Sequence, residues 1–207
     1  LINYQYDPED NYSLANNSIH SIYQDISGRI WLGTFNQGVS YWDSYGVRFQ
    51  TYRHKNKEKS LSSNAVSVFE QGHSAATVWV GTDGGGLNLW NRKDDTFESF
   101  QQGKDKGFTS NAILALYKNN HEGLWIGTWG GGLMYKKQGT EEFLNYETLG
   151  TEEERPLHVF QIIPDEKENL WLATFDKGLC YYDLKSNRII SFMESGGKAM
   201  QTALSTC

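Results

Sequence analysis

The chain has little of several residue types that mark common classes of protein. Its 207 residues include two cysteines, Cys180 and Cys207, and neither their number nor their placement indicates a disulfide framework or a metal site. Lys and Arg together number 19 against 25 Asp and Glu, and the cations are scattered rather than gathered in a stripe. Since a basic patch is the usual mark of proteins that bind nucleic acids or anionic membranes, we expect neither as a partner.

Long hydrophobic runs are also missing. The longest, such as residues 112–117, have the length of a strand, whereas a membrane span takes roughly 20 apolar residues. No targeting segment is visible, and the chain begins at Leu1 rather than at a methionine. We therefore expect its start to be a cut or processed end.

Aromatic residues and glycine are abundant instead. The chain has 10 Phe, 7 Trp, 12 Tyr and 21 Gly, against 3 Pro. Aromatic side chains suit the pleated, half-buried surfaces of sheets, and glycine supplies the frequent turns that many short strands need. The composition therefore favours β structure.

One motif occurs four times in the chain. It reads apolar, Trp, apolar, Gly or Ala, Thr, and it is found at residues 30–34, 78–82, 124–128 and 170–174. The tryptophans are 48, 46 and 46 residues apart. Four residues after each threonine comes a glycine: Gly38, Gly86, Gly132 and Gly178. An apolar run precedes each tryptophan, and at 47-residue steps these runs are introduced by Asn17, Asn64, Asn111 and His158.

Each repeat thus contains four short strand signals separated by turns. The period matches the roughly 40–50 residues of a four-stranded propeller blade. We predict an all-β fold, a β-propeller built of four-stranded antiparallel blades. In the first blade we expect strands at 19–25, 29–34, 39–43 and 48–52. The tryptophans of the motif are interpreted as core between blades, not as platforms for a ligand; they are Trp31, Trp79, Trp125 and Trp171.

The predicted blades occupy most of residues 1–207, at 17–52, 64–100, 111–146 and 158–192. Residues 1–6 resemble the outer strand of a preceding blade, because Leu1–Tyr4 matches 49–52, and residues 193–207 resemble the approach to a further blade. The chain is therefore predicted to be a fragment of a larger ring. Closure on itself and completion by a second copy are the alternatives. Open blade faces favour association, either with the remaining blades or with another copy.

The motifs resemble those of a known family. The succession of residues 61–66, 78–82, 84–87 and 97–100 is similar to the two component regulator propeller repeat. That resemblance implies a periplasmic, non-catalytic sensor segment of a hybrid two-component regulator from Bacteroides-type bacteria. In that family the rings are usually seven-bladed, recognise oligosaccharides, work as dimers, and are followed by a β-sandwich domain, a membrane helix and a histidine kinase. None of those following parts is present in this chain.

The loops after the four threonines are the predicted ligand site, because their residues differ from blade to blade on a repeated scaffold. Aromatic rings beside amides and acids are typical of sugar binding, and Trp129 is the strongest candidate for a stacking platform. The alternative is that these aromatics cover neighbouring blades. The candidate residues are Phe35, Asn36, Asp83, Trp129, Phe175 and Asp176.

Other functions were weighed on the same loops. Asp83 and Asp176 could serve a propeller glycosidase only if their carboxylates face each other at roughly 5–9 Å, and solvated loop acids are the simpler interpretation. A streptogramin-lyase-like enzyme would depend on His20 and His158, yet the histidines show no metal-ligand spacing. A third hypothesis is a purely structural or dimerisation propeller. We predict no enzyme activity in this segment, no metal and no cofactor.

Overall fold

The computed structural model describes residues 3–10, 12–43, 46–55, 59–121, 123–146, 157–175 and 177–192. Within these ranges the regular structure is entirely β. The strands are β1 (Ile19–Gln24), β2 (Ile30–Thr34), β3 (Val39–Asp43), β4 (Gly46–Tyr52), β5 (Val66–Gln71), β6 (Thr77–Thr82), β7 (Gly86–Asn91), β8 (Thr96–Phe100), β9 (Ile113–Lys118), β10 (Leu124–Thr128), β11 (Leu133–Lys136), β12 (Phe143–Tyr146), β13 (Val159–Pro164), β14 (Leu170–Thr174), β15 (Leu179–Asp183) and β16 (Arg188–Ser191). No helix long and apolar enough to cross a membrane occurs in the described ranges.

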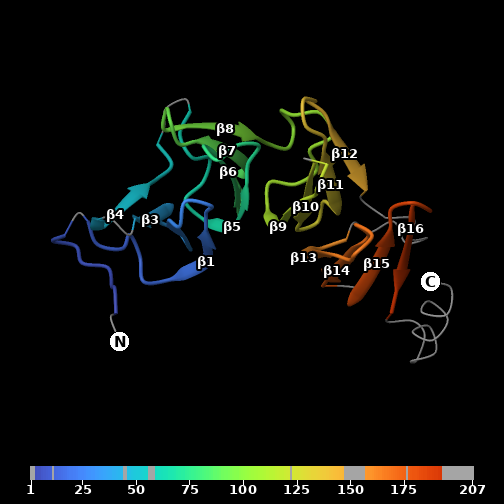
Figure 1. Ribbon diagram of the computed structural model, residues 1–207, viewed down its shortest axis with the longest axis horizontal. Helices are drawn as coiled ribbons and strands as arrows, with labels where there is room; N and C mark the ends of the chain where they lie inside the picture. Colours follow the sequence, from blue (N-terminus) through green and yellow to red (C-terminus); the bar gives the residue numbers. More distant parts are fainter. Residues whose placement is uncertain are drawn as a thin grey trace.

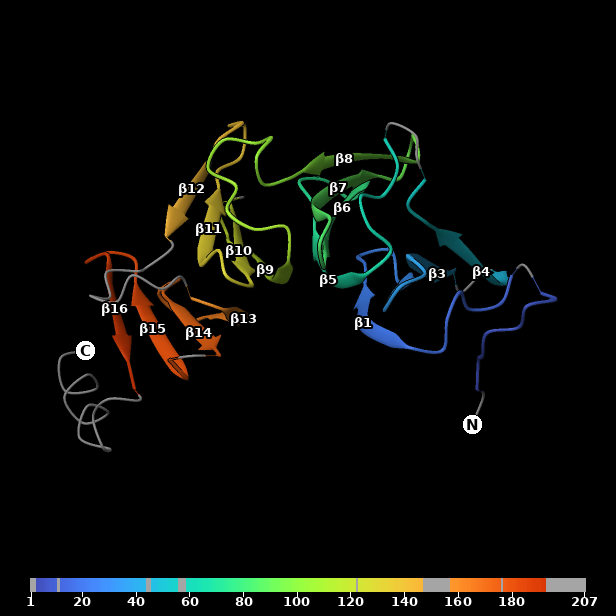
Figure 2. The same ribbon diagram turned by 180° about the vertical axis from the view of Figure 1, so that it is seen from behind.

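Consecutive strands form four antiparallel four-stranded sheets, which confirms the predicted blades. Blade 1 is β1 to β4, blade 2 is β5 to β8, blade 3 is β9 to β12 and blade 4 is β13 to β16. Figure 1 shows the blades following one another along an arc, with the first strand of each blade innermost and the fourth outermost. The inner strands β1, β5, β9 and β13 contact one another in succession, and the same arc is seen from behind in Figure 2.

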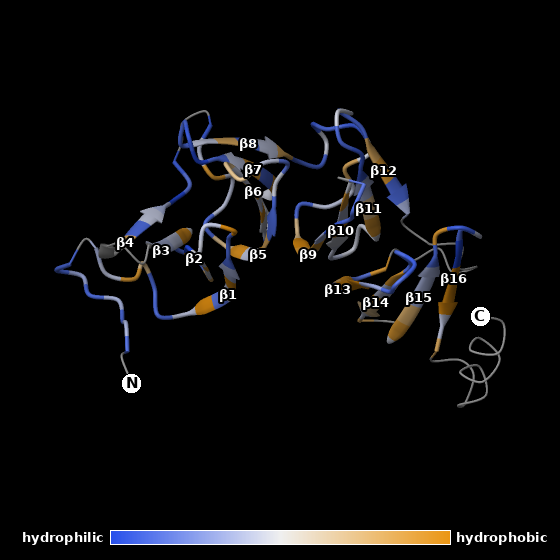
Figure 3. Ribbon diagram, in the orientation of Figure 1, coloured by the Kyte–Doolittle hydropathy of each residue, from blue (hydrophilic) through white to orange (hydrophobic). Residues whose placement is uncertain are grey.

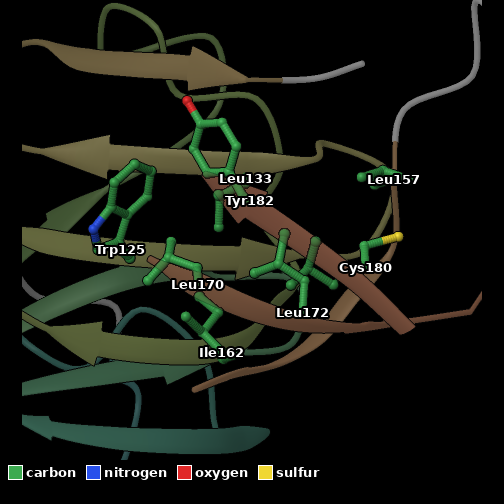
Figure 4. Packing of buried hydrophobic residues seen from close by; sticks show 10 residues of the cluster. Trp125, Leu133, Leu157, Ile162, Leu170, Leu172, Cys180 and Tyr182 are labelled. Carbon is green, nitrogen blue, oxygen red and sulfur yellow. The ribbon is translucent and has the colours of Figure 1, made fainter. Parts of the chain in front are cut away.

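Apolar residues are concentrated in the strands, and the connecting loops are mostly hydrophilic (Figure 3). The motif tryptophans of blades 1, 2 and 3 face the next blade along the chain. Trp31 meets Trp90 of blade 2 with ring centroids 4.7 Å apart, and Trp79 packs in the same way in the core shared with blade 3. In Figure 4, Trp125 lies beside Leu170 of blade 4. These three tryptophans are buried, as predicted, whereas Trp171 in the last blade is half-buried.

Cys180 is a free, buried thiol in the same core as Trp125. Burial raises the pKa of this thiol, with smaller opposing effects from hydrogen bonds and from Lys177. It is therefore a small core residue, as the sequence predicts. Cys207 lies outside the described residues.

The glycine of the motif is required where a further blade follows. A Cβ added to Gly33 would clash with Oγ of Ser21 in its own blade. It would also lie 2.8 Å from Cγ1 of Val66, and one added to Gly127 would lie 2.8 Å from the carbonyl oxygen of Val159. The contacts with Val66 and Val159 are with the inner strand of the next blade, so a side chain at this point would force the blades apart. Blade 4 has Ala173 at this position, and there the residue is exposed.

The N-terminal segment departs from the predicted outer strand. Residues 3–6 form no strand, and residues 1 and 2 lie outside the described ranges. Even so, the ring of Tyr4 contacts Phe49 at 5.4 Å, as the ring of Tyr52 contacts Phe97 at 6.2 Å. Tyr4 therefore takes the place of an outer-strand aromatic without the strand, which would need a neighbouring strand to pair with. Residues 193–207, the predicted lead into a further blade, also lie outside the described residues.

Candidate functional site

The loop between the second and third strands is closed in the same way in every blade. The threonine Oγ1 donates a hydrogen bond to the carbonyl oxygen of the glycine four residues later, at 2.7–2.8 Å. The glycines have φ between 61° and 85°, a region that favours glycine. The repeated Thr and Gly are thus local loop geometry, which leaves the residues between them free to vary. The pairs are Thr34–Gly38, Thr82–Gly86, Thr128–Gly132 and Thr174–Gly178.

The first residue of each loop lies beside the start of the inner strand of its own blade. Its N–H donates to a carbonyl oxygen just before that strand, at 2.8–3.1 Å. The four pairs are Phe35 with Ser18, Asp83 with Ala65, Trp129 with Ala112, and Phe175 with His158. Four candidate residues therefore occupy equivalent positions on one face, which we call the loop face.

These bonds correct one predicted correspondence. His158 was expected to match Asn17, Asn64 and Asn111, but it matches the residue after each of them. Leu157 takes the place of the asparagine, since its carbonyl oxygen accepts the N–H of Gly132 as that of Asn111 accepts the N–H of Gly86. The step from Asn111 to Leu157 is 46 residues, the spacing that the tryptophans show at this point.

A β-bulge interrupts every inner strand at the same point of its register. In β1, β5, β9 and β13 alike, the extra residue is the second residue of the strand. It lies opposite the step between the last two residues of the motif, for example Gly127–Thr128 in blade 3. Bulges redirect a side chain that would otherwise follow the regular alternation. The bulged residues are His20, Ser67, Leu114 and Phe160. Sequence reasoning missed the position that they share, because these four residues have no common chemical type; only His20 was weighed, as a candidate for a lyase-like enzyme.

The bulged residue and the first loop residue meet within a blade. The rings of His20 and Phe35 are 5.0 Å apart, and those of Phe160 and Phe175 are 6.2 Å apart. Each of the two terminal blades thus presents an aromatic loop residue with a ring from its inner strand. In blade 2 the bulged Ser67 instead donates to the carbonyl oxygen of Ile113 at 2.5 Å.

Among the described residues, blades 3 and 4 together form the largest group of exposed rings on the loop face. Trp129 contacts His158 at 4.2 Å, Phe175 at 5.5 Å and Phe160 at 5.8 Å, measured between ring centroids. Trp129 and Phe160 are each 45% exposed and Phe175 is 65% exposed. We call these four residues the aromatic cluster. Trp129 therefore fits both interpretations, a cover for a neighbouring blade and a platform for a ligand: it packs on blade 4 and still presents a large exposed surface.

Among the described candidate residues, the structure brings together two and places Phe35, Asn36 and Asp83 in other blades. Trp129 and Phe175 belong to the aromatic cluster, joined by Phe160 and His158. Phe35 and Asn36 are in blade 1, where Asn36 Oδ1 accepts from Asn16 Nδ2 at 3.2 Å. Asp83 is exposed in the loop of blade 2. Asp176 lies outside the described residues, so the predicted carboxylate pair has no measured separation.

Carboxyl groups with clearly shifted pKa values lie at the other end of the strands. Burial raises the pKa of Glu70, while hydrogen bonds from the N–H of Gln71 and Lys118 partly oppose it. Burial also acts on Asp25, but hydrogen bonds from Ser27 and Trp31 outweigh it, and its pKa is lowered. Both belong to junctions between blades rather than to the loop face. In the described part of the chain, no three His, Cys, Asp or Glu side chains are grouped so that they could hold a metal ion.

Comparison with known proteins agrees with this architecture. The repeat pattern and the sheets define a propeller of four-stranded blades. Residues 13–36 match the family model of the two component regulator propeller. This segment of the chain is thus similar to the repeat that the motifs predict. No curated protein matches the chain.

Solved structures from Bacteroides thetaiotaomicron share the fold. The extracellular domain of BT3049, proposed to be a hybrid two component system, is 19% identical with a TM-score of 0.78 over 91% of this chain. The extracellular domain of BT4673, proposed to be a one component system, is 24% identical with a TM-score of 0.70 over 85% of it. An auxiliary nutrient binding protein is 13% identical with a TM-score of 0.61 over 91%. This chain spans 25% of the first two structures and 46% of the third.

Proposed function

We propose that this chain is part of an extracytoplasmic, non-catalytic sensor propeller of a two-component system, and that its loop face binds an oligosaccharide. Support comes from the family repeat at residues 13–36 and from the fold shared with extracellular domains of such systems. The chain covers only a quarter of those structures, so membrane anchoring, dimerisation and signalling would belong to the longer protein.

The observation that carries the proposal is the aromatic cluster. Exposed rings gathered at one place on a soluble surface are unusual unless something covers them. Sugar rings present C–H faces that stack on aromatic rings, while their hydroxyl groups need polar partners. Two hydroxyl groups lie at the loop of Trp129: Ser110 Oγ donates to the carbonyl oxygen of Trp129 and Thr109 Oγ1 donates to that of Gly131, each at 2.7 Å.

The experiment is thermal unfolding of the chain against a panel of plant and host oligosaccharides, for wild type and Trp129→Ala. A ligand that binds only the folded state stabilises it by about 2.7 kcal/mol at one hundred times its Kd. We expect a shift in Tm with one glycan class, the sugar remaining intact, and loss of that shift in Trp129→Ala. Phe35→Ala is the matched control, because Phe35 has the same loop position in blade 1 but lies outside the cluster.

Three results would count against the proposal. A Tm shift retained in Trp129→Ala would remove the cluster from the site. Cleavage of the glycan would favour the enzyme alternative. No shift with any glycan would favour a structural role.

A structural role has its own supporting observation. Ile22 of β1 is 72% exposed, although its counterparts in the other blades are buried by the blade before them. An open blade face of this kind favours association, with further blades or with a second copy of the chain. Light scattering of the purified chain over a range of concentrations tests this second candidate function. A monomer at all concentrations would rule out self-association.

A further inference from the structure

Phe160 is placed unusually for a large aromatic residue in an inner strand. Val159 before it and Ile162 after it are buried in the junction with blade 3, while Phe160 and Gln161 are both exposed. A regular strand would alternate, and the bulge at Phe160 is what breaks the alternation. The backbone therefore turns this ring out of the junction and onto the loop face.

The three exposed rings of the aromatic cluster pack against one another. Their centroids are 5.5–6.2 Å apart, which leaves no room between them for an inserted group. The planes of Trp129 and Phe160 meet at 78°, and Phe175 is inclined by 52° and 49° to them. A ligand must then lie on the outer surface of the cluster, where Phe160 contributes a face at a steep angle to that of Trp129.

The described residues that form the cluster and its adjoining segments carry little charge, which favours one class of ligand. In residues 109–114, 128–132, 157–160 and 174–178, the charged residues are Lys177 and Asp176, and the position of Asp176 is not described. The rest are aromatic, aliphatic, hydroxyl, amide or glycine residues and one histidine. Recognition of sulfate or carboxylate groups usually takes arginine or several cations in a fixed geometry. The described residues of these segments include one cation, Lys177, and no arginine. The composition instead suits an uncharged, hydroxyl-rich ligand.

We propose that Phe160 contacts the ligand directly, forming with Trp129 and Phe175 a subsite for an uncharged sugar ring. This inference rests on the proposed function and adds to it a residue that the sequence did not indicate and a class of sugar. Phe160 would supply a second stacking surface, so that the ligand is held at a corner rather than on a flat platform.

The test measures Kd by titration calorimetry for wild type, Phe160→Ala, Phe160→Tyr and Ile163→Ala. The probes are two sets of tetrasaccharides, one of neutral hexose and pentose units and one bearing uronate or sulfate groups. We expect binding of a neutral tetrasaccharide, a Kd raised about tenfold or more by Phe160→Ala, and a Kd nearly restored by Phe160→Tyr, which keeps the ring. Ile163→Ala is the control, because Ile163 is on the same strand and 50% exposed but is not part of the cluster.

The outcomes separate this inference from the proposed function. Neutral binding unaffected by Phe160→Ala overturns the role of Phe160 and leaves the sensor proposal standing. Binding of charged sugars alone overturns the class of ligand and also leaves it standing. An equal loss in Ile163→Ala shows a general effect on blade 4 and overturns the direct contact. No binding of any probe overturns both proposals.

Discussion

The junctions between blades and the two open ends of the arc contain the same motif in different surroundings. Trp79 is 1% exposed because blade 3 covers it, whereas Trp171 occupies the same position in blade 4 and is only half-buried. At the other end, Ile22 is 72% exposed while its counterpart Phe69 is 8% exposed. The motif thus marks a surface that is made to be covered, and burial is decided by whether a neighbouring blade is present.

The turns between the first and second strands of blades 1 and 4 also differ in whether their polar contacts reach a neighbouring blade. Oδ2 of Asp25 in blade 1 accepts from Trp31 Nε1 at 3.0 Å and pairs with Arg92 of blade 2. Oδ2 of Asp165 in blade 4 accepts from Tyr181 and Asn169 of its own blade instead. The first aspartate therefore links two blades, while the second serves only its own turn. Substitutions at matched positions should therefore lower stability more at a junction between blades than at an end of the arc.

The largest difference is expected between two tryptophan truncations. Trp79→Ala should lower the free energy of unfolding by about 3–5 kcal/mol, because it opens a cavity in the closed junction of blades 2 and 3. Trp171→Ala should cost about 1 kcal/mol, because the residue is already partly in water. Urea unfolding followed by circular dichroism measures both. Equal losses would show that blade 4 is stabilised as the inner blades are.

A smaller effect is expected at the motif glycine. A Cβ on Gly81 would lie 2.6 Å from Cγ1 of Val68 and 2.8 Å from Cγ2 of Ile113 in the next blade. Gly81→Ala should therefore destabilise the chain by about 1–3 kcal/mol through overpacking. Ala173→Gly, the reverse change at the open end, should cost about 0.5–1 kcal/mol from backbone entropy alone. A neutral result for Gly81→Ala in the same unfolding assay would contradict the close approach of the blades.

A third effect is expected at the turn aspartates, and it depends on pH. The pKa of Asp25 is lowered from 3.8, since hydrogen bonds from Ser27 and Trp31 outweigh the effect of burial. Its ionised form therefore stabilises the fold; this contribution is complete above about pH 4 and is lost as the pH falls through the lowered pKa. Asp25→Asn should cost about 1–2 kcal/mol at pH 7 and reduce the loss of stability on acidification.

Asp165→Asn is the matched control for that experiment. The pKa of Asp165 is also lowered, because hydrogen bonds from Tyr181 and Asn169 outweigh a raising effect of burial. It makes no contact with another blade among its described bonds, so we expect a smaller change at pH 7. Urea unfolding between pH 3 and pH 7 gives both profiles. A larger effect at Asp165 would remove the junction as the source of the difference.

The fold could be predicted because its determinants are local and repeated. The threonine at each loop bonds to a glycine only four residues away, and the tryptophan recurs at a step set by the length of a blade. The candidate site was predicted only in part. Trp129 and Phe175 were found because aromatic residues in a loop are conspicuous, and His158 was placed beside them, though one residue out of register. Phe160 looked like an ordinary strand residue, and only the bulge places it on the loop face.

The sequence by itself determined that this protein is a series of four-stranded blades and which loops share a face. Those features follow from spacing, turn residues and alternation within about fifty residues. Only the tertiary structure decided which tryptophans are buried, where the inner strands bulge, and that rings from two blades meet in one cluster. These features depend on contacts between blades. The sequence of one repeat does not show whether a neighbouring blade packs against it.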